Sequence, residues 1–176
     1  MRAECVAPRA ASAHNAAIMD PEFTAGFSEY VDASAARMRT MSDAAAAAPR
    51  KPGAWSPKQI VGHLIDSAAN NQTRFVRAQL QQDLVFPGYD QDAWVSVQRY
   101  QDRSWPELID LWRAYNHQIA AIMRSAAPAD LTRARARHNL HEIAFEQLPD
   151  GAAATLEYLM RDYVTHLKHH VQQILA

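Results

Sequence analysis

The sequence predicts an all-α protein folded as a four-helix bundle, and three observations lead to this fold class. Glycine is scarce, with 5 in 176 residues, and the 9 prolines fall where a helical chain would break. Between those breaks, four long segments place apolar side chains at mostly three- and four-residue steps, as amphipathic helices do. No segment shows the apolar–polar alternation of a strand. Four such helices in one chain of this size are best buried against one another.

The first helix is expected to begin at Pro21, with Asp20 as its cap. Its apolar stripe follows at helical spacing through Phe23, Phe27, Tyr30, Val31, Ala35, Met38 and Met41. Residues 48–53 hold two prolines and a glycine, so the helix ends before this first linker. Residues 1–19 are alanine-rich and lack apolar periodicity. They are expected to form a flexible extension ahead of one folded domain that spans residues 20–176.

The second and third helices carry sequence signals at their N-termini. The Ser56 side chain can cap the second helix while Gln59 bonds back to the Ser56 amide, which is a capping box. Ser104 and Glu107 repeat this pattern at the start of the third helix. The second helix is expected to continue until the break at residues 86–88, which contains a proline and a glycine.

The fourth helix is expected to begin around Thr155 and to run to the end of the sequence. Two long connections then remain, residues 83–103 between the second and third helices and about 127–154 between the third and fourth. Connections of this length are usually functional, partly structured or crossovers. In the first of them, Asp90 is expected to cap a short helix that carries Trp94.

Charge and cysteine content exclude several classes of protein. Eighteen Lys and Arg face 19 Asp and Glu, a net charge of −1, so neither a broad nucleic-acid footprint nor a polybasic membrane patch is expected. The single cysteine, Cys5, can form neither an intrachain disulfide nor a Cys-rich zinc site. No window approaches the roughly 20 apolar residues of a transmembrane helix. We therefore expect a cytoplasmic protein without nucleic-acid or membrane partners.

Three histidines are the strongest candidates for chemistry. His166 and His170 both lie on the apolar seam of the fourth helix, and side chains four residues apart can present nitrogens to one point. His63 lies near the start of the second helix, at the edge of its apolar stripe. Each of them alone is explained by a satisfied core histidine. Together they indicate a divalent metal site, because burying several imidazoles without partners is costly.

Other residues around this cluster are candidates for supporting roles. Asp66 or Asp162 could accept the second ring N–H of a metal-bound histidine, and His169 lies one residue off the seam. Both carboxylates are equally explained as solvated surface groups. His117, His138 and His141 are weaker candidates to approach the site. The sequence lacks a nucleophile elbow, a phosphate-binding glycine loop, the zincin motif and the paired Glu-x-x-His motifs of ferritin-type proteins.

Three segments in this order, residues 55–67, 89–94 and 163–174, resemble the DinB-like superfamily. The branch that they resemble most is that of the YfiT-type metal-dependent hydrolases and thiol transferases. The resemblance covers the chain from about residue 20 to its end. It implies an up-up-down-down four-helix bundle, often dimeric, that holds a divalent metal through His63, His166 and His170.

The activities that the resemblance implies include transfers that use a low-molecular-weight thiol, although many members of the superfamily have no established reaction. The leading hypothesis is a cytoplasmic enzyme whose zinc, nickel, iron or manganese ion activates a thiol or water against a small electrophilic substrate. The alternative is a non-catalytic dimeric metal-binding or stress-response protein with a structural metal. No general base stands out, and the candidates for this role or for lining the pocket are Asp66, Asn70, Tyr89, Trp94 and His141. The two aromatic residues among them are equally explained by packing.

Overall fold

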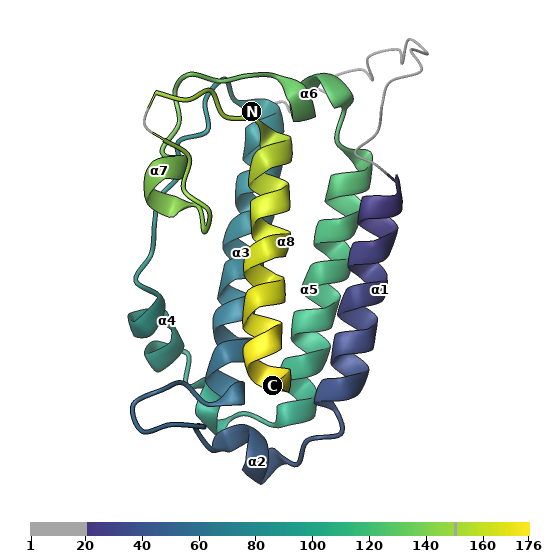
Figure 1. The fold of residues 1–176 in the computed structure, drawn as a ribbon, viewed down its shortest axis with the longest axis vertical. Coiled ribbons are helices and arrows are strands. Elements are labelled where there is room, and N and C mark those ends of the chain that lie inside the picture. Colours follow the sequence, from purple (N-terminus) through teal and green to yellow (C-terminus); the bar gives the residue numbers. More distant parts are fainter. Residues whose placement is uncertain (1–20, 150) are drawn as a thin grey trace, which may run out of the picture.

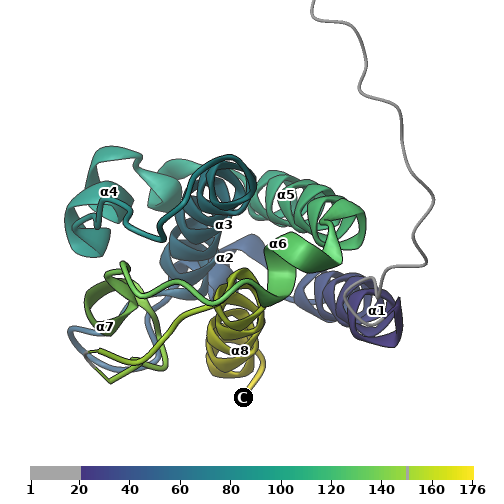
Figure 2. The ribbon, with the colours of Figure 1, turned by 90° about the horizontal axis from the view of Figure 1, so that it is seen from above.

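Four long helices lie side by side in the computed structural model, which describes residues 21–149 and 151–176 (Figures 1 and 2). They are α1 (Pro21–Met38), α3 (Pro57–Leu80), α5 (Trp105–Ser125) and α8 (Leu156–Leu175). The described residues contain no strand beyond two isolated β-bridges, so the predicted all-α four-helix bundle is confirmed. The predicted flexible extension, residues 1–19, and the predicted cap, Asp20, lie outside the described residues.

Shorter helices occupy the connections. They are α2 (Asp43–Ala47), α4 (Gln91–Val97), the 3-10 helix η1 (Tyr100–Asp102), α6 (Pro128–Thr132) and α7 (Leu140–Ile143). The predicted short helix is therefore present as α4, and the Asp90 carboxylate caps it by accepting from Ala93 N at 3.0 Å. Leu84 and His138 form a β-bridge that ties the two long connections together.

The helix directions differ from the up-up-down-down order. Trp105 at the start of α5 donates its indole N–H to the carbonyl oxygen of Met38 at the end of α1, at 2.9 Å. Arg50, in the linker after α1, donates to the carbonyl oxygen of Ala176 at 2.6 Å, so α8 ends at the same end of the bundle. Along the chain the helices therefore run up, down, down, up, because the α3–α5 connection travels back along the bundle (Figure 1).

The two predicted capping boxes have different outcomes. At α3 the box is complete, with Ser56 N donating to Gln59 Oε1 at 2.9 Å and Gln59 N donating to Ser56 Oγ at 3.3 Å. At α5 the prediction is wrong, because the Ser104 side chain makes no capping hydrogen bond. The carboxylate of Asp43 accepts from Trp105 N at 2.9 Å instead, and an ionised acceptor is stronger than a hydroxyl.

The core lies between the four long helices, and its largest fully buried side chains include Trp105, Trp112, Tyr163, Phe27 and Phe75. Helix α3 packs against both α5 and α8 and is the most buried of the four. Its first turns face the last turns of α8, since the two helices are antiparallel (Figure 1). No helix in the described part of the chain is long and apolar enough to cross a membrane.

Candidate metal centre

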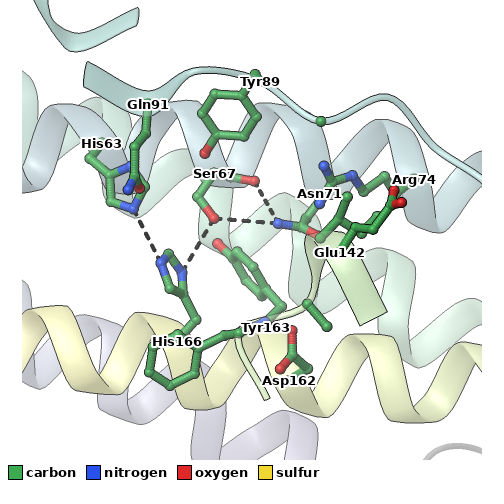
Figure 3. A pocket seen from close by; sticks show the side chains of 14 residues that line it. His63, Ser67, Asn71, Arg74, Tyr89, Gln91, Glu142, Asp162, Tyr163 and His166 are labelled. Carbon is green, nitrogen blue, oxygen red and sulfur yellow. Dashed lines mark hydrogen bonds between the residues drawn. The ribbon is translucent and has the colours of Figure 1, made fainter. Parts of the chain in front are cut away.

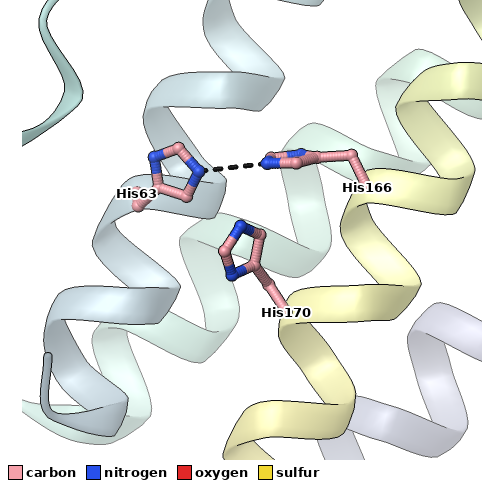
Figure 4. Close-up of side chains that lie close together, drawn as sticks. All are labelled: His63, His166 and His170. Carbon is pink, nitrogen blue, oxygen red and sulfur yellow. Dashed lines mark hydrogen bonds between the residues drawn. The ribbon is translucent and has the colours of Figure 1, made fainter. Parts of the chain in front are cut away.

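The three predicted histidines lie together where α3 faces α8 (Figure 4). His63 comes from the second turn of α3, and His166 and His170 come from the second half of α8. The Nε2 atoms of His63 and His166 are 3.1 Å apart, and one ring nitrogen from each of the three lies within 4.8 Å of the others. The fold therefore brings together the set that spacing and resemblance indicated.

The chemistry of this cluster fits a divalent ion. Two nitrogens that ligate one ion at about 2.1 Å are roughly 3 to 3.5 Å apart, which matches the spacing of His63 and His166. His63 is 2% exposed, and its Nδ1 atom has no hydrogen-bond partner among the described residues. Its Nε2 atom faces a second imidazole nitrogen, that of His166, and a cation between the two would satisfy both.

Burial also keeps the rings in the form that binds metals. It lowers the pKa of His63 to about 4, with a smaller contribution from the charge of His170. It lowers the pKa of His166 to about 3, and the neighbouring histidines contribute in the same direction. The pKa of His170 is lowered by burial as well. Near neutral pH these imidazoles are uncharged, with a lone pair on each ring available to a cation.

Two side chains contact the Nδ1 atoms of the α8 histidines. His166 Nδ1 lies 3.4 Å from Ser67 Oγ, and His170 Nδ1 lies 2.9 Å from Gln173 Oε1. Gln173 also contacts His169 through its amide nitrogen, at 3.0 Å. Bonds of this kind select the tautomer and the ring orientation of a metal ligand. Neither Ser67 nor Gln173 was predicted for this role.

The two carboxylates expected to support the histidines make no hydrogen bond to them, and Asp66 Oδ2 has no partner among the described residues. Asp66 Oδ1 accepts from the Tyr100 hydroxyl at 2.6 Å and from Gln98. The oxygens of Asp162 accept from the backbone N–H groups of Phe145 and Glu146, at 3.1 and 2.7 Å. Burial raises the pKa of both Asp66 and Asp162. These carboxylates therefore fix the two long connections against α3 and α8.

A cavity of about 300 Å³ opens beside His63 and His166 (Figure 3). Its other lining residues are Ser67, Asn71, Arg74, Gly88, Tyr89, Gln91, Glu142, Ile143, Ala144, Phe145, Asp162 and Tyr163. Both long connections contribute to this wall. Two of the three histidines therefore border a space that a small molecule can enter.

Of the predicted supporting candidates, Tyr89 and Asp162 line this cavity. The others do not, namely Asp66, Asn70, Trp94, His117, His138, His141 and His169. Asn70 and Trp94 line a neighbouring cavity of about 230 Å³. His169 packs its ring against Phe145, with ring centroids 5.2 Å apart. His141 packs against the ring of His138 at 6.0 Å.

Sequence reasoning overlooked three polar residues that α3 contributes to the cavity, Ser67, Asn71 and Arg74. They follow His63 at steps of four, four and three residues, so they share its face of α3. Extending the helical period from His63 would have found them. The contribution of Phe145 could not be found in this way, because it comes from an irregular segment whose path depends on tertiary contacts.

A four-helix bundle with three histidines clustered on two adjacent helices defines the class, an all-α protein with a candidate metal centre. Residues 28–174 match the sequence model of the DinB superfamily, and the chain belongs to this superfamily.

Individual relatives agree with this assignment. "Putative metal-dependent hydrolase YfiT" of Bacillus subtilis (strain 168) is 24% identical over 137 residues, 78% of this chain and 71% of the relative. "Putative metal-dependent hydrolase OB0782" of Oceanobacillus iheyensis is 23% identical over 124 residues, 70% of this chain and 65% of the relative. The solved structure of YfiT from Bacillus subtilis, described as a probable metal-dependent hydrolase with an unusual four-helix bundle topology, covers 96% of this chain and 89% of its own. It aligns with a TM-score of 0.67 at 21% identity, which supports the shared fold.

The metal-free protein is expected to lose stability as the pH falls from 6.5 toward 4. The unfolded chain binds protons at His63 and His166 near pH 6.5, whereas the folded chain binds them only near pH 4 and 3. The free energy of unfolding should therefore decrease as the pH is lowered. The slope should approach about 1.4 kcal/mol per pH unit for each histidine. Denaturant unfolding of chelator-treated protein between pH 7.5 and 4.5 measures this slope. In the double variant His63→Gln with His166→Gln, the free energy of unfolding should depend less steeply on pH in this window. An unchanged slope would contradict the prediction.

Proposed function

We propose that the chain is a divalent-metal-dependent enzyme in which His63, His166 and His170 hold the ion. The adjoining cavity takes a small electrophilic substrate together with water or a low-molecular-weight thiol. The observation that carries the proposal is that His63 and His166 line an open cavity of about 300 Å³. Structural metal sites are closed by protein ligands, whereas catalytic sites keep a position open. Relatives named as metal-dependent hydrolases support the proposal.

The residues around the cluster would prepare it for this role. Ser67 and Gln173 restrain the rings of His166 and His170, which leaves the remaining nitrogen of each ring free for an ion. Burial keeps the rings uncharged. A divalent ion held by three imidazoles supplies Lewis-acid chemistry, since it lowers the pKa of water or a thiol enough to form a nucleophile near neutral pH.

The two long connections would shape the substrate space. Phe145 packs its ring against His166, with centroids 5.3 Å apart, and forms part of the cavity wall. Tyr89 lies on the opposite wall, and burial raises its pKa to about 12. Its hydroxyl therefore stays protonated at neutral pH and can donate a hydrogen bond to a substrate oxygen.

Metal content and turnover together test the proposal. The protein is stripped with a chelator, reconstituted separately with zinc, nickel, iron and manganese, and examined by elemental analysis and with thiols or water against small electrophiles. We expect about one ion per chain with at least one metal, and turnover that depends on it. Failure to bind any of the four ions would overturn the proposal. The homodimer, the cytoplasmic location and the choice between thiol and water stay predictions.

Removal of the metal is expected to leave the bundle folded. The core between the four long helices consists of apolar side chains, while His166 and His170 are only half-buried at its edge. Far-ultraviolet circular dichroism and thermal unfolding before and after chelation would measure this, with retained helicity and lost turnover expected. Unfolding on chelation would favour the alternative, a protein whose metal is structural.

A further inference from the structure

Arg74 lines the end of the cavity that lies away from the three histidines (Figure 3). It is 7% exposed, although a guanidinium has five N–H donors to satisfy. Among the described residues, Arg74 has one hydrogen-bond acceptor, the carbonyl oxygen of Pro87 at 3.1 Å. No carboxylate oxygen of the described chain lies within 4.0 Å of its nitrogens. Donors of this buried cation therefore remain available to a ligand.

A second buried arginine shows the difference. Arg135 is 3% exposed and donates to the carbonyl oxygens of Ala78, Asp130 and Arg133 at 2.8, 3.4 and 3.3 Å. These bonds tie the α5–α8 connection to the end of α3, which accounts for its burial. Arg135 does not line the cavity. Within the described chain, Arg74 has one acceptor where Arg135 has three, and none of the Arg74 nitrogens is buried without a partner, so its unbonded N–H groups stay accessible.

The cavity has two chemically different ends on one face of α3. His63 and Arg74 are eleven residues apart, which corresponds to roughly 16 Å along a helix. Ser67 and Asn71 lie between them, and Asn71 donates to Ser67 Oγ at 3.3 Å. A ligand that reaches from the histidines to Arg74 would cross this polar floor (Figure 3).

We infer that Arg74 binds a carboxylate group of the small molecule whose reacting end lies at the three histidines. The planar guanidinium matches a carboxylate with two parallel hydrogen bonds. Asp162 lines the same cavity with both oxygens already bonded to backbone N–H groups, and Glu142 is an exposed member of the wall. With these acidic groups nearby, the single cation favours a singly charged carboxylate over a doubly charged phosphate.

This inference deepens the proposed function and rests on it only for the position of the reacting end. The test therefore uses metal-free protein. Glutarate and its uncharged diamide, glutaramide, are titrated separately while the amide signals of Arg74 and Tyr89 are followed by NMR. Glutarate is expected to shift these signals at saturable concentrations, and glutaramide is expected to bind at least roughly tenfold more weakly.

Two matched variants assign the effect to one side chain. Arg74→Gln is expected to weaken glutarate binding by roughly tenfold or more, because charge-assisted hydrogen bonds are lost. Arg77→Gln removes the same charge one turn later on α3, from an exposed residue that does not line this cavity, and should leave the affinity unchanged. Arg74→Lys, which keeps the charge and loses the planar fork, should give an intermediate affinity.

Equal glutarate affinity in Arg74→Gln and Arg77→Gln would overturn the inference, as would equal binding of glutaramide or tighter binding of inorganic phosphate. Thermal unfolding and metal content of each variant are measured in parallel. Normal metal content without Arg74-dependent glutarate binding refutes this inference alone. Arg74-dependent binding in a protein that takes up no metal supports the carboxylate subsite and refutes the proposed function alone.

Discussion

Replacing Gly62 with alanine is expected to lower the free energy of unfolding by about 3 kcal/mol, the upper end of the usual cost of overpacking. A Cβ atom at this position would lie 2.1 Å from Tyr100 Cδ2 and 2.3 Å from its Cγ. The Tyr100 ring cannot move away easily, since it is 2% exposed and its hydroxyl donates to Asp66 at 2.6 Å. Urea unfolding of Gly62→Ala measures the loss.

Gly26 provides a matched control for this substitution. It lies in α1, and a Cβ atom there would meet nothing within 4 Å. Gly26→Ala should therefore stabilise the protein by roughly 0.4–1 kcal/mol, as expected for a helical glycine without a steric conflict. The clash is tested directly by placing Gly62→Ala in a Tyr100→Ala background, where the ring contacts are gone and only the contact with the Cβ atom of residue 100, at 2.8 Å, remains, so its cost should be smaller. Equal effects of the two glycine substitutions would contradict this explanation.

Local signals predicted the helices well where the partners are close in sequence. Ser56 and Gln59 cap α3 as expected, because both sides of the box lie within four residues. The prediction for the start of α5 was wrong, because the backbone N–H of Trp105 donates to Asp43, 62 residues earlier in the sequence. The order of helix directions differed for a related reason, since α3 runs antiparallel to α1 and the long connection after α3 returns along the bundle, so that α5 runs parallel to α3. A long connection allows either direction, and only its packing along the bundle decides between them.

The histidine cluster was predictable for a different reason. His166 and His170 are neighbours by helical geometry alone, whereas His63 joins them only when α3 packs against α8. Periodicity placed His63 on an inward face, and the family resemblance supplied the pairing. The carboxylates Asp66 and Asp162 could not be assigned from spacing, because their hydrogen-bond partners belong to connections that have no periodic pattern.

Replacing His166 with alanine is expected to lower divalent-metal affinity by more than about 100-fold, since even the loss of a residue that supports a ligand costs 10–100-fold. His166 is one corner of a triangle of rings, with centroids 5.1 Å apart for His63 and His166, 4.9 Å for His63 and His170 and 4.6 Å for His166 and His170. Metal titration of the stripped variant, followed by elemental analysis, measures the affinity. Turnover should be lost in parallel if the ion is catalytic.

His169→Ala is the control that makes this result specific, because it removes an imidazole from the same helix outside the cluster. Its affinity is expected to stay within a few-fold of the unsubstituted protein, whereas Ser67→Ala should weaken binding about tenfold through the released ring of His166. This order of effects follows from what each side chain contacts, because His166 offers a ligand nitrogen and Ser67 contacts the His166 ring, whereas His169 bonds only to Gln173 among the described residues. Stoichiometric metal in His166→Ala would place the ion elsewhere, and equal losses in His166→Ala and His169→Ala would indicate binding by exposed histidines in general.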